Sequence, residues 1–217
     1  MSYESVTARA AEAAARSSRS PDGIVVVAVS KARSAAEIMT VYERGHRDFG
    51  ENRAQELTAK APELPEDIRW HFVGALQSNK ARVVRPVAHL LHSMDRPSLG
   101  AAWRKGPGPA PPALLQVNLG RERGKAGVGA EAAEAALTGL VALGLDIVGL
   151  TAIPPIPDNP EASRPHFRRL REMRDRLAAT FPALGELSMG MSDDFETAIE
   201  EGATIIRVGR AIFGPRD

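Results

Sequence analysis

Residues 24–31 read IVVVAVSK, and they decide the class of fold that the chain adopts. This run of β-branched residues follows a turn signal, Pro-Asp-Gly at 21–23, which is typical of the start of a buried strand. Because side chains alternate between the two faces of a strand, one face carries Val25, Val27, Val29 and Lys31. If that face lines a barrel, the valines fill its interior and Lys31 emerges at the carboxyl-terminal rim.

Strand-like stretches recur along the rest of the chain, and helical sequence follows each of them. The expected strands cover residues 24–30, 46–49, 69–73, 89–93, 113–118, 146–151, 186–189 and 204–208. The expected helices cover residues 34–44, 52–60, 78–85, 97–104, 130–143, 163–180, 193–201 and 210–213. Eight alternating units in 217 residues predict a parallel sheet closed into a compact (β/α)8 TIM barrel. An open doubly wound sheet is the alternative, disfavoured because no Gly-x-Gly-x-x-Gly motif follows the first strand.

Two segments bear on the domain organisation. Residues 1–20 are Ala- and Arg-rich and amphipathic, and we expect them to form a helix packed outside the barrel. They have no apolar core of a secretory signal, and Glu4 and Glu12 argue against a transit peptide. Residues 105–112, KGPGPAPP, resemble a linker between two domains. Since the strand–helix rhythm resumes after them, we interpret them as a loop and residues 1–217 as a single barrel domain.

Composition narrows the partners and the chemistry. The 28 Lys and Arg residues nearly balance the 27 Asp and Glu residues, which gives no reason to expect nucleic acid or a membrane as partner. The absence of cysteine excludes disulfides, Cys-ligated zinc and thiol nucleophiles, and agrees with a reducing, cytoplasmic location. No stretch approaches the roughly 18 apolar residues of a membrane span. His89 and His92 face opposite sides of an expected strand, so we expect no metal site, and His71 is expected to be a hydrogen-bonded core residue.

Lys31 is a candidate nucleophile because of its expected place at the barrel rim. Active sites of this fold lie there. A partly desolvated amine has a lowered pKa and forms a Schiff base with a carbonyl compound. Taken alone the signal is weak, because a lysine at the end of a strand is usually a solvated surface residue.

The last two loops add a candidate phosphate site. ELSMGMS at 186–192 and TIIRVGRAIFG at 204–214 follow the seventh and eighth strands, where this fold often binds phosphate. Gly209 permits close approach of an anion to the backbone, the helix that follows offers N–H groups, and the Ser192 hydroxyl is a further donor. Glycines that merely make tight turns are the alternative for either loop. Both loops together with Lys31 favour a phosphate-bearing carbonyl cofactor.

Arg207 lies in an otherwise apolar strand, two residues before Gly209. Alternation places Ile205, Arg207 and Gly209 on the inner face of the barrel. A buried arginine is costly without a partner, and either a pyridine nitrogen or a buried carboxylate would be one. Arg207 stays charged, so it would keep a pyridine nitrogen unprotonated, and such a ring is a poorer electron sink for carbanion chemistry.

Five stretches of the chain carry a family resemblance: VVVAVSK ending at Lys31, DFGENRAQE at 48–56, WHFVGALQSNK at 70–80, QVN with GKAGV at 116–128, and LSMGMSDDFETAIEEGATIIRVGRAIFG at 187–214. These stretches resemble the pyridoxal phosphate homeostasis protein family, the small relatives of the alanine racemase barrel domain. They occur in family order and cover nearly the whole chain. WHFVGALQSNK and LSMGMSDDF are long and specific.

The resemblance implies an alanine-racemase-like barrel that binds pyridoxal 5'-phosphate. It implies that Lys31 carries the cofactor as an internal aldimine and that Arg207 faces the pyridine nitrogen. Asn52 would lie beside the cofactor. The phosphate would be bound by Ser192, Gly209 and Arg210.

Two residues depart from the family pattern, and a third is a further candidate contact. Arg210 stands where the family usually has a small hydroxyl residue, so one phosphate hydrogen bond is lost, although the backbone N–H remains and the guanidinium is a candidate replacement. Thr151 stands where methionine is common, which affects the expected pocket shape. Lys125 in GKAGV is a further candidate phosphate contact, with a solvated loop lysine as the simpler interpretation.

Two functions remain open. The first is a non-catalytic protein of vitamin B6 homeostasis that carries or buffers the cofactor, with pyridoxal-phosphate-dependent apoenzymes as recipients. The second is an amino-acid racemase, which needs acid–base groups on both faces of the substrate Cα. In the alanine racemases that this chain resembles, a tyrosine from a further domain supplies one of these groups. This chain ends about three residues after the last motif, and Tyr3 and Tyr42 are not expected near the rim. We therefore expect the carrier, as a monomer or weak dimer.

Overall fold

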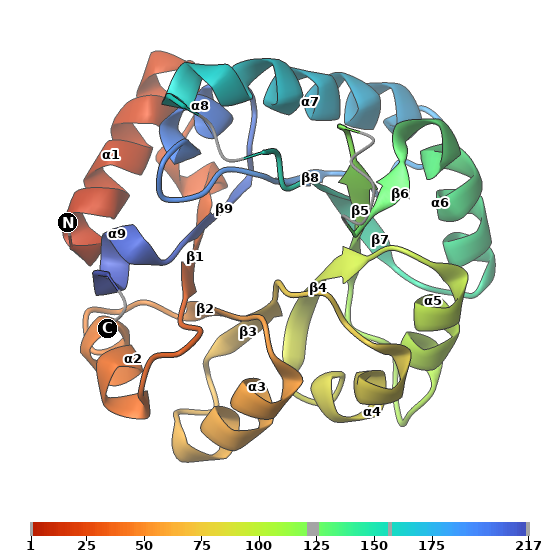
Figure 1. Cartoon of the computed structure of the whole chain (residues 1–217), viewed down its shortest axis with the longest axis horizontal. Coiled ribbons are helices and arrows are strands. Elements are labelled where there is room, and N and C mark those ends of the chain that lie inside the picture. Colours follow the sequence, from red (N-terminus) through yellow and green to blue (C-terminus); the bar gives the residue numbers. More distant parts are fainter. Residues whose placement is uncertain (1, 121–125, 156–157, 216–217) are drawn as a thin grey trace.

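Eight parallel strands close into a ring in the computed structural model, which describes residues 2–120, 126–155 and 158–215. The ring consists of β1 (Val25–Val29), β2 (Asp48–Glu51), β3 (Arg69–Phe72), β4 (Ala88–Met94), β5 (Ala113–Asn118), β7 (Ile147–Thr151), β8 (Glu186–Ser188) and β9 (Ile205–Val208). Pairing of β4 with β5 and of β9 with β1 completes the circle. Helices surround it on the outside (Figure 1). The predicted (β/α)8 barrel is confirmed.

The helices follow the strands as the sequence predicts. They are α1 (Tyr3–Arg16), α2 (Ala35–Tyr42), α3 (Ala54–Lys60), α4 (Ala81–Val84), α5 (Pro97–Arg104), α6 (Ala133–Ala142), α7 (Arg164–Ala178), α8 (Phe195–Glu200) and α9 (Arg210–Phe213). Short 3-10 turns lie at Pro21–Gly23, Ala61–Glu63, Ser78–Lys80, Ala130–Ala132 and Pro160–Ser163. A capping box fixes the start of α2, because Ser34 and Glu37 each accept a hydrogen bond from the other's backbone N–H.

Two strands differ from the expectation. β2 begins and ends two residues later than the expected strand at 46–49. Gly50 lies within β2, paired with Val29 and His71, and the interior has no room for a side chain there: a Cβ would lie 2.8 Å from Val27 Cγ1. The sequence pattern also missed β6 (Val128–Gly129), a two-residue strand that pairs with β5 beside the ring.

The hydrophobic core has two layers. The larger one lies between the strands and the surrounding helices and includes Phe49, Leu99 and Trp103, all fully buried. The smaller one fills the barrel interior with Val27, Leu90, Leu114 and Ile205, and Val25 and Val29 pack against it. The expected inner face of β1 is therefore confirmed. Above this apolar layer the interior becomes polar, and this polar layer leads into the candidate site.

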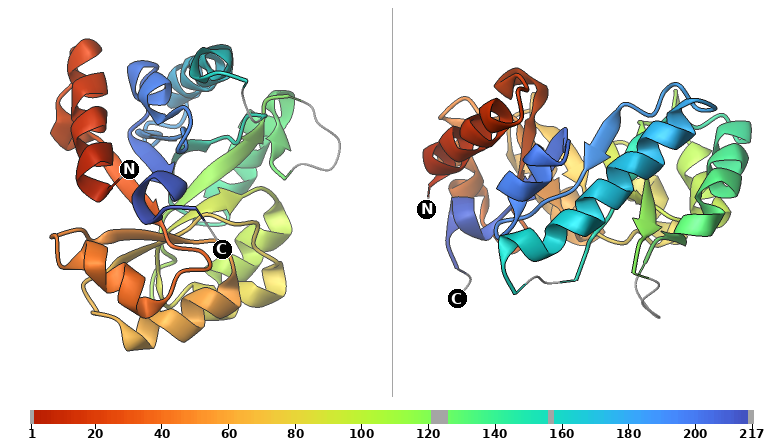
Figure 2. Two further views of the ribbon diagram at one scale, coloured as in Figure 1. Left: turned by 60° about the vertical axis from the view of Figure 1, so that its left-hand side comes forward. Right: turned by 90° about the horizontal axis from the view of Figure 1, so that it is seen from above.

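Helix α1 packs on the outer surface of the barrel. It lies beside α8 and α9, which bring the end of the chain back to its beginning (Figures 1 and 2). Val6, Ala10, Ala13 and Ala14 form its buried stripe. Ion pairs from Arg9 to Glu196 and from Arg16 to Glu200 join it to α8.

Candidate functional site

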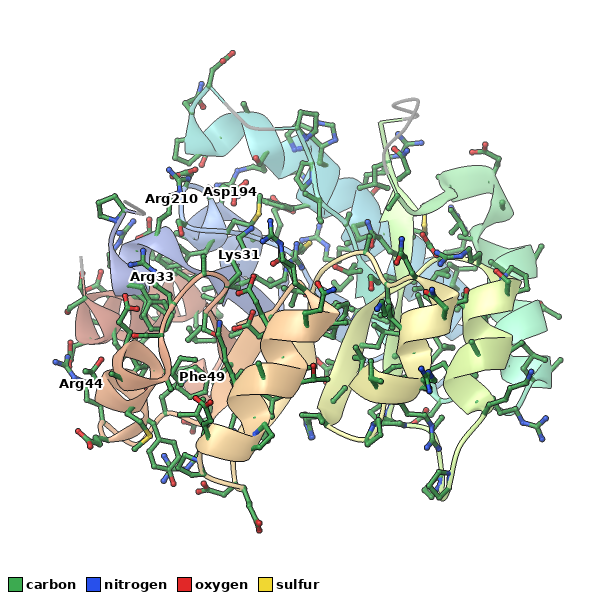
Figure 3. All side chains as sticks on the ribbon, turned by 60° about the horizontal axis from the view of Figure 1, so that its bottom comes forward. Lys31, Arg33, Arg44, Phe49, Asp194 and Arg210 are labelled. Atoms are coloured by element: carbon green, nitrogen blue, oxygen red, sulfur yellow. The ribbon has the colours of Figure 1, made fainter. Side chains whose placement is uncertain are left out.

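A cavity of about 500 Å³ lies at the end of the barrel that is formed by the carboxyl ends of the strands. All six residues that the sequence nominates contribute to its lining, although they are spread from position 31 to position 210: Lys31, Asn52, Ser192, Arg207, Gly209 and Arg210. Figure 3 shows Lys31, Asp194 and Arg210 gathered at one end of the molecule, away from Phe49 and Arg44. The geometry therefore brings the nominated residues together, while their roles toward a ligand stay a prediction.

Lys31 enters the cavity from a sharp turn directly after β1. The next residue, Ala32, has a φ of 58°, in the left-handed region that residues other than glycine rarely adopt. Its backbone N–H donates a 2.7 Å hydrogen bond to Glu56 Oε2 on α3. Strained backbone of this kind persists where the surroundings hold it, and it is common at functional sites. The turn therefore sets the direction in which Lys31 leaves the strand.

A buried ionic cluster supports the same turn from outside the cavity. Lys60 donates to the Ser30 carbonyl at 3.0 Å and forms ion pairs with Glu51 at 2.6 Å and Glu56 at 3.2 Å. Ser30 Oγ donates to Glu51 Oε1 at 2.8 Å. Burial raises the pKa of the Glu51 carboxyl, whereas Lys60 acts in the opposite direction. The stretch DFGENRAQE contains both glutamates, but the sequence analysis singled out only Asn52 from it.

Asn52 follows β2, and its side chain carries a buried hydrogen-bond acceptor. Its Oδ1 is buried and has no hydrogen-bond partner among the described residues. Such an atom is costly unless a ligand or water satisfies it. Gly74, at the end of β3, crowds against the Asn52 backbone so closely that a Cβ would lie 2.1 Å from the Asn52 carbonyl oxygen. The position of Asn52 at the cavity wall therefore depends on glycine at residue 74.

The loops after β8 and β9 form the opposite wall. Ser192 Oγ accepts a 3.4 Å hydrogen bond from the backbone N–H of Ala211, which leaves its own hydrogen for another acceptor. Gly209 lies against the Val29 carbonyl, since a Cβ would come within 3.1 Å of that oxygen. Arg210 forms an ion pair with Asp193 at the exposed rim.

Asp194 stabilises this wall through both of its carboxylate oxygens. The sequence predicted that Asp193 and Asp194 begin a helix, and Asp194 is indeed the residue before α8. Its side chain, however, does not cap that helix. Asp194 Oδ1 accepts from the Met191 N–H at 2.8 Å, and Oδ2 accepts from Ser163 Oγ at 2.7 Å. It thus fixes the loop that carries Ser192.

The described residues of the cavity lining carry an excess of positive charge. Among them, four cationic side chains, Lys31, Arg33, Arg207 and Arg210, face two carboxylates, Asp193 and Asp194. Arg33 is anchored by Glu37 and by the carbonyls of Gly214 and Pro215. A dianion such as a phosphate monoester suits this excess of positive charge.

Arg207 is 6% exposed and points from β9 toward the centre of the barrel. Nη1 donates to Thr151 Oγ1 at 3.0 Å and to the Ser188 carbonyl and Oγ at 2.7 and 2.5 Å, and Nη2 donates to the Ala152 carbonyl at 3.0 Å. Burial lowers the pKa of Arg207 to about 10. None of the ion pairs among the described residues involves it, so the alternative of a buried salt bridge is not what the structure contains.

Thr151 has a different role from the one expected. The sequence suggested that this departure from the family pattern would affect pocket shape, but Thr151 does not line the cavity. Instead its hydroxyl donates to the Ser188 carbonyl at 2.8 Å and accepts from Arg207. Thr151 and Ser188 are supports of Arg207 that the sequence analysis missed, because they depend on which residues of β7, β8 and β9 lie side by side.

The remaining residues considered in the sequence lie away from the cavity or outside the described residues. Lys125 is not among the described residues. Tyr3 packs against the ring of His46, and the Tyr42 hydroxyl donates to Asp67, so neither tyrosine lines the cavity. In the part of the chain that the structure describes, no cluster of His, Cys, Asp or Glu is arranged to hold a metal ion, and no helix is long and apolar enough to cross a membrane.

Comparisons with known proteins agree with this geometry. Over residues 4–217 the chain matches the family described as alanine racemase, N-terminal domain. The pyridoxal phosphate homeostasis protein of Pseudomonas aeruginosa is 41% identical over 217 residues, which cover 98% of this chain and 93% of that protein. The protein of the same name from Aquifex aeolicus is 40% identical, with 97% and 95% covered. A solved structure of PipY from Synechococcus elongatus with pyridoxal phosphate bound is 38% identical, covers 95% of this chain and 100% of that one, and has a TM-score of 0.81.

Proposed function

This chain belongs to the pyridoxal phosphate homeostasis protein family, and from that premise we propose that it binds pyridoxal 5'-phosphate in the cavity at the carboxyl ends of its strands. One observation carries the proposal: six residues nominated from the sequence, including a lysine, converge on one positively charged cavity. The buried, unpartnered Oδ1 of Asn52 is a second point of fit, because a polar ligand beside it would satisfy that atom. The PipY structure, which has the cofactor bound, supports the same conclusion.

The proposal gives each residue a role. Lys31 holds the cofactor covalently, through a bond between Nζ and the aldehyde carbon that forms with loss of water. Ser192, Gly209 and Arg210 bind the phosphate, Ser192 with the hydroxyl hydrogen that Ala211 leaves available. Asn52 lies beside the ring of the cofactor. Arg207, which lines the same cavity, would face the ring nitrogen with its guanidinium.

We assign the protein to storage and delivery of the cofactor rather than to catalysis. When bound, this cofactor supplies an electron sink for carbanion chemistry, and an unprotonated ring nitrogen makes it a poorer one. Arg207 opposes protonation because it is itself a donor and remains charged. The curated relatives are named as homeostasis proteins. Recipient apoenzymes, a cytoplasmic location and a monomeric or weakly dimeric state complete the proposal.

Reconstitution tests the proposal directly. The purified protein is incubated with pyridoxal phosphate and desalted, and retained cofactor is measured by absorbance and by intact mass after borohydride reduction. Wild type and the control Lys105→Ala, at an exposed lysine, should retain one cofactor per chain, whereas Lys31→Ala should retain none covalently. A wild-type protein that takes up no cofactor would falsify the binding claim. Turnover of an amino acid at roughly 1 s⁻¹ or faster would overturn the non-enzymatic assignment.

A further inference from the structure

A chain of five hydrogen-bonded side chains crosses the barrel interior below the cavity. Arg207 Nη1 lies 2.5 Å from Ser188 Oγ, and Ser188 Oγ lies 2.9 Å from His92 Nδ1. His92 Nε2 lies 2.9 Å from His71 Nδ1, and His71 Nε2 lies 3.1 Å from Asp48 Oδ1. We call these residues the buried polar chain. It links the candidate site to the opposite end of the barrel.

The buried polar chain is unusual for its place in the fold. His92 on β4 and Ser188 on β8 are not on neighbouring strands, because β5 and β7 lie between them in the ring. Their hydrogen bond therefore spans the lumen, which in this fold is normally filled by branched apolar side chains. All five residues are buried. A buried polar network is costly unless every member is satisfied, so this one must have a specific arrangement of protons.

Asp48, at one end of the buried polar chain, is a carboxylate anion. Burial alone would raise the pKa of Asp48, but hydrogen bonds from Arg69 and His71 lower it well below its usual range. Arg69 contacts both carboxylate oxygens, at 2.8 and 2.5 Å. Because this charge is already matched, a second cation at His71 would be a buried charge without compensation. His71 is therefore expected to be neutral.

With an anion at one end and a guanidinium at the other, one direction of donation satisfies every atom. Asp48 only accepts, so His71 carries its proton on Nε2 and its Nδ1 accepts from His92 Nε2–H. Burial lowers the pKa of His92 well below its usual value, and the positive charge of Arg207 acts in the same direction, so His92 is neutral too. Its Nδ1 then accepts from Ser188 Oγ–H, and Ser188 Oγ accepts from Arg207.

We propose that Ser188, His92 and His71 are positioning residues that hold Arg207 as a permanent hydrogen-bond donor toward the ring nitrogen of the bound cofactor. The inference rests on the proposed function. Within the buried polar chain every hydrogen bond is donated in the direction of Asp48, so the Ser188 hydroxyl always offers Arg207 a lone pair. Nη1 is thereby held by Ser188 while Nη2 donates to the Ala152 carbonyl, so the guanidinium has a fixed orientation where Arg207 lines the cavity. The arrangement selects a ligand whose ring nitrogen is an acceptor.

Nitrogen NMR of the wild-type protein tests the direction of donation without any substitution. Loaded with pyridoxal phosphate, the protein should show His71 and His92 both as neutral imidazoles that carry their proton on Nε2. Both histidines must have this tautomer, because the direction of donation in the buried polar chain depends on it. A proton on Nδ1 of either histidine, or a doubly protonated His71, reverses part of the chain and overturns the inference.

A ligand whose ring nitrogen cannot accept a hydrogen bond tests the consequence for ligand specificity. The probe is pyridoxal phosphate methylated on the ring nitrogen, which carries a fixed positive charge. Wild type should prefer the unmethylated cofactor. The Kd of the methylated compound divided by the Kd of the unmethylated one should fall about tenfold in Ser188→Ala and His92→Leu, because one hydrogen bond to a charged group is lost. His92→Gln retains a donor and an acceptor and should keep the wild-type ratio. His89→Gln is the matched control, since this histidine lies on the same strand with its ring 5.7 Å from that of His71.

Failure of the proposed function and failure of the inference give different results. A wild-type protein that binds neither compound overturns the proposed function, and the inference with it. If wild type binds pyridoxal phosphate but folded Ser188→Ala and His92→Leu keep the wild-type ratio, only the inference is overturned. Should both variants fail to fold, the tautomers of His71 and His92 in the wild type decide the matter.

Discussion

The backbone N–H of Ala32 donates a hydrogen bond of 2.7 Å to Oε2 of Glu56. This contact joins the residue directly after Lys31 to helix α3, and it fixes Ala32 in a left-handed conformation with a φ of 58°. Such a conformation costs an alanine roughly 1–2 kcal/mol, so the contact must offset that cost. Glu56 is thereby responsible for the direction of Lys31 without touching the cavity itself.

Substitution of Glu56 should loosen the turn that carries Lys31. Glu56→Ala removes the partner of the Ala32 N–H and one partner of Lys60, and should lower the free energy of unfolding by about 1–2 kcal/mol. It should also weaken retention of pyridoxal phosphate several-fold. Urea unfolding and a cofactor titration measure the two effects. Glu66→Ala, at an exposed glutamate, should change neither quantity, and equal cofactor affinity in Glu56→Ala and wild type would contradict the role of the turn.

Thr151 should be needed for the position of Arg207. Thr151→Val keeps the shape of the side chain but removes the hydroxyl that accepts from Arg207 and donates to the Ser188 carbonyl. We expect a loss of about 1–2 kcal/mol in unfolding free energy, because buried groups lose their partners. The preference for unmethylated over ring-methylated cofactor should fall as well. Thr138→Val, at an exposed threonine of α6, is the control, and equal losses in both variants would argue against a special role of Thr151.

The sequence predicted the barrel and the lining of the cavity because both follow from simple patterns. Alternation along β1 and β9 placed Val27 and Ile205 inside the barrel, and the structure confirms both. The same alternation directed Lys31 and Arg207 to one end. Motif resemblance then nominated Asn52, which lines the cavity although no pattern of burial marked it.

The supports of these residues could not be predicted in the same way. Glu56 reaches Ala32 from α3, and Ser188 reaches Arg207 and His92 across the lumen. These contacts depend on strand register and on the twist of the closed ring, which hydrophobic periodicity does not specify. His92 shows the limit well: its strand was predicted, and its separation from the exposed His89 was expected, but not its partner on β8.

Asp193 should compete with the phosphate for Arg210. The two side chains form an ion pair at the exposed rim, where such pairs are weak and sensitive to salt. Asp193→Ala should therefore release Arg210 and raise the affinity for pyridoxal phosphate by about threefold at low salt. The gain should disappear in 1 M salt and should be absent for pyridoxal, which has no phosphate. In Arg210→Ser the same Asp193→Ala change should give a smaller gain, and a gain of equal size would show that Arg210 is not the competing group.

The buried histidines should make stability depend on pH. His92 is neutral in the folded protein because burial and the charge of Arg207 lower its pKa, whereas in the unfolded chain it takes up a proton below about pH 6.5. The unfolded state then binds more protons, so the free energy of unfolding falls as pH drops below about 6.5. His92→Gln removes this group and should reduce the slope by up to about 1.4 kcal/mol per pH unit, as measured by urea unfolding between pH 5 and 8. Ser188→Ala breaks the same chain without removing a titrating group, so it should lower stability throughout and keep the slope. An unchanged slope in His92→Gln would mean that His92 binds a proton equally in both states, contrary to the neutral imidazole that the buried polar chain requires.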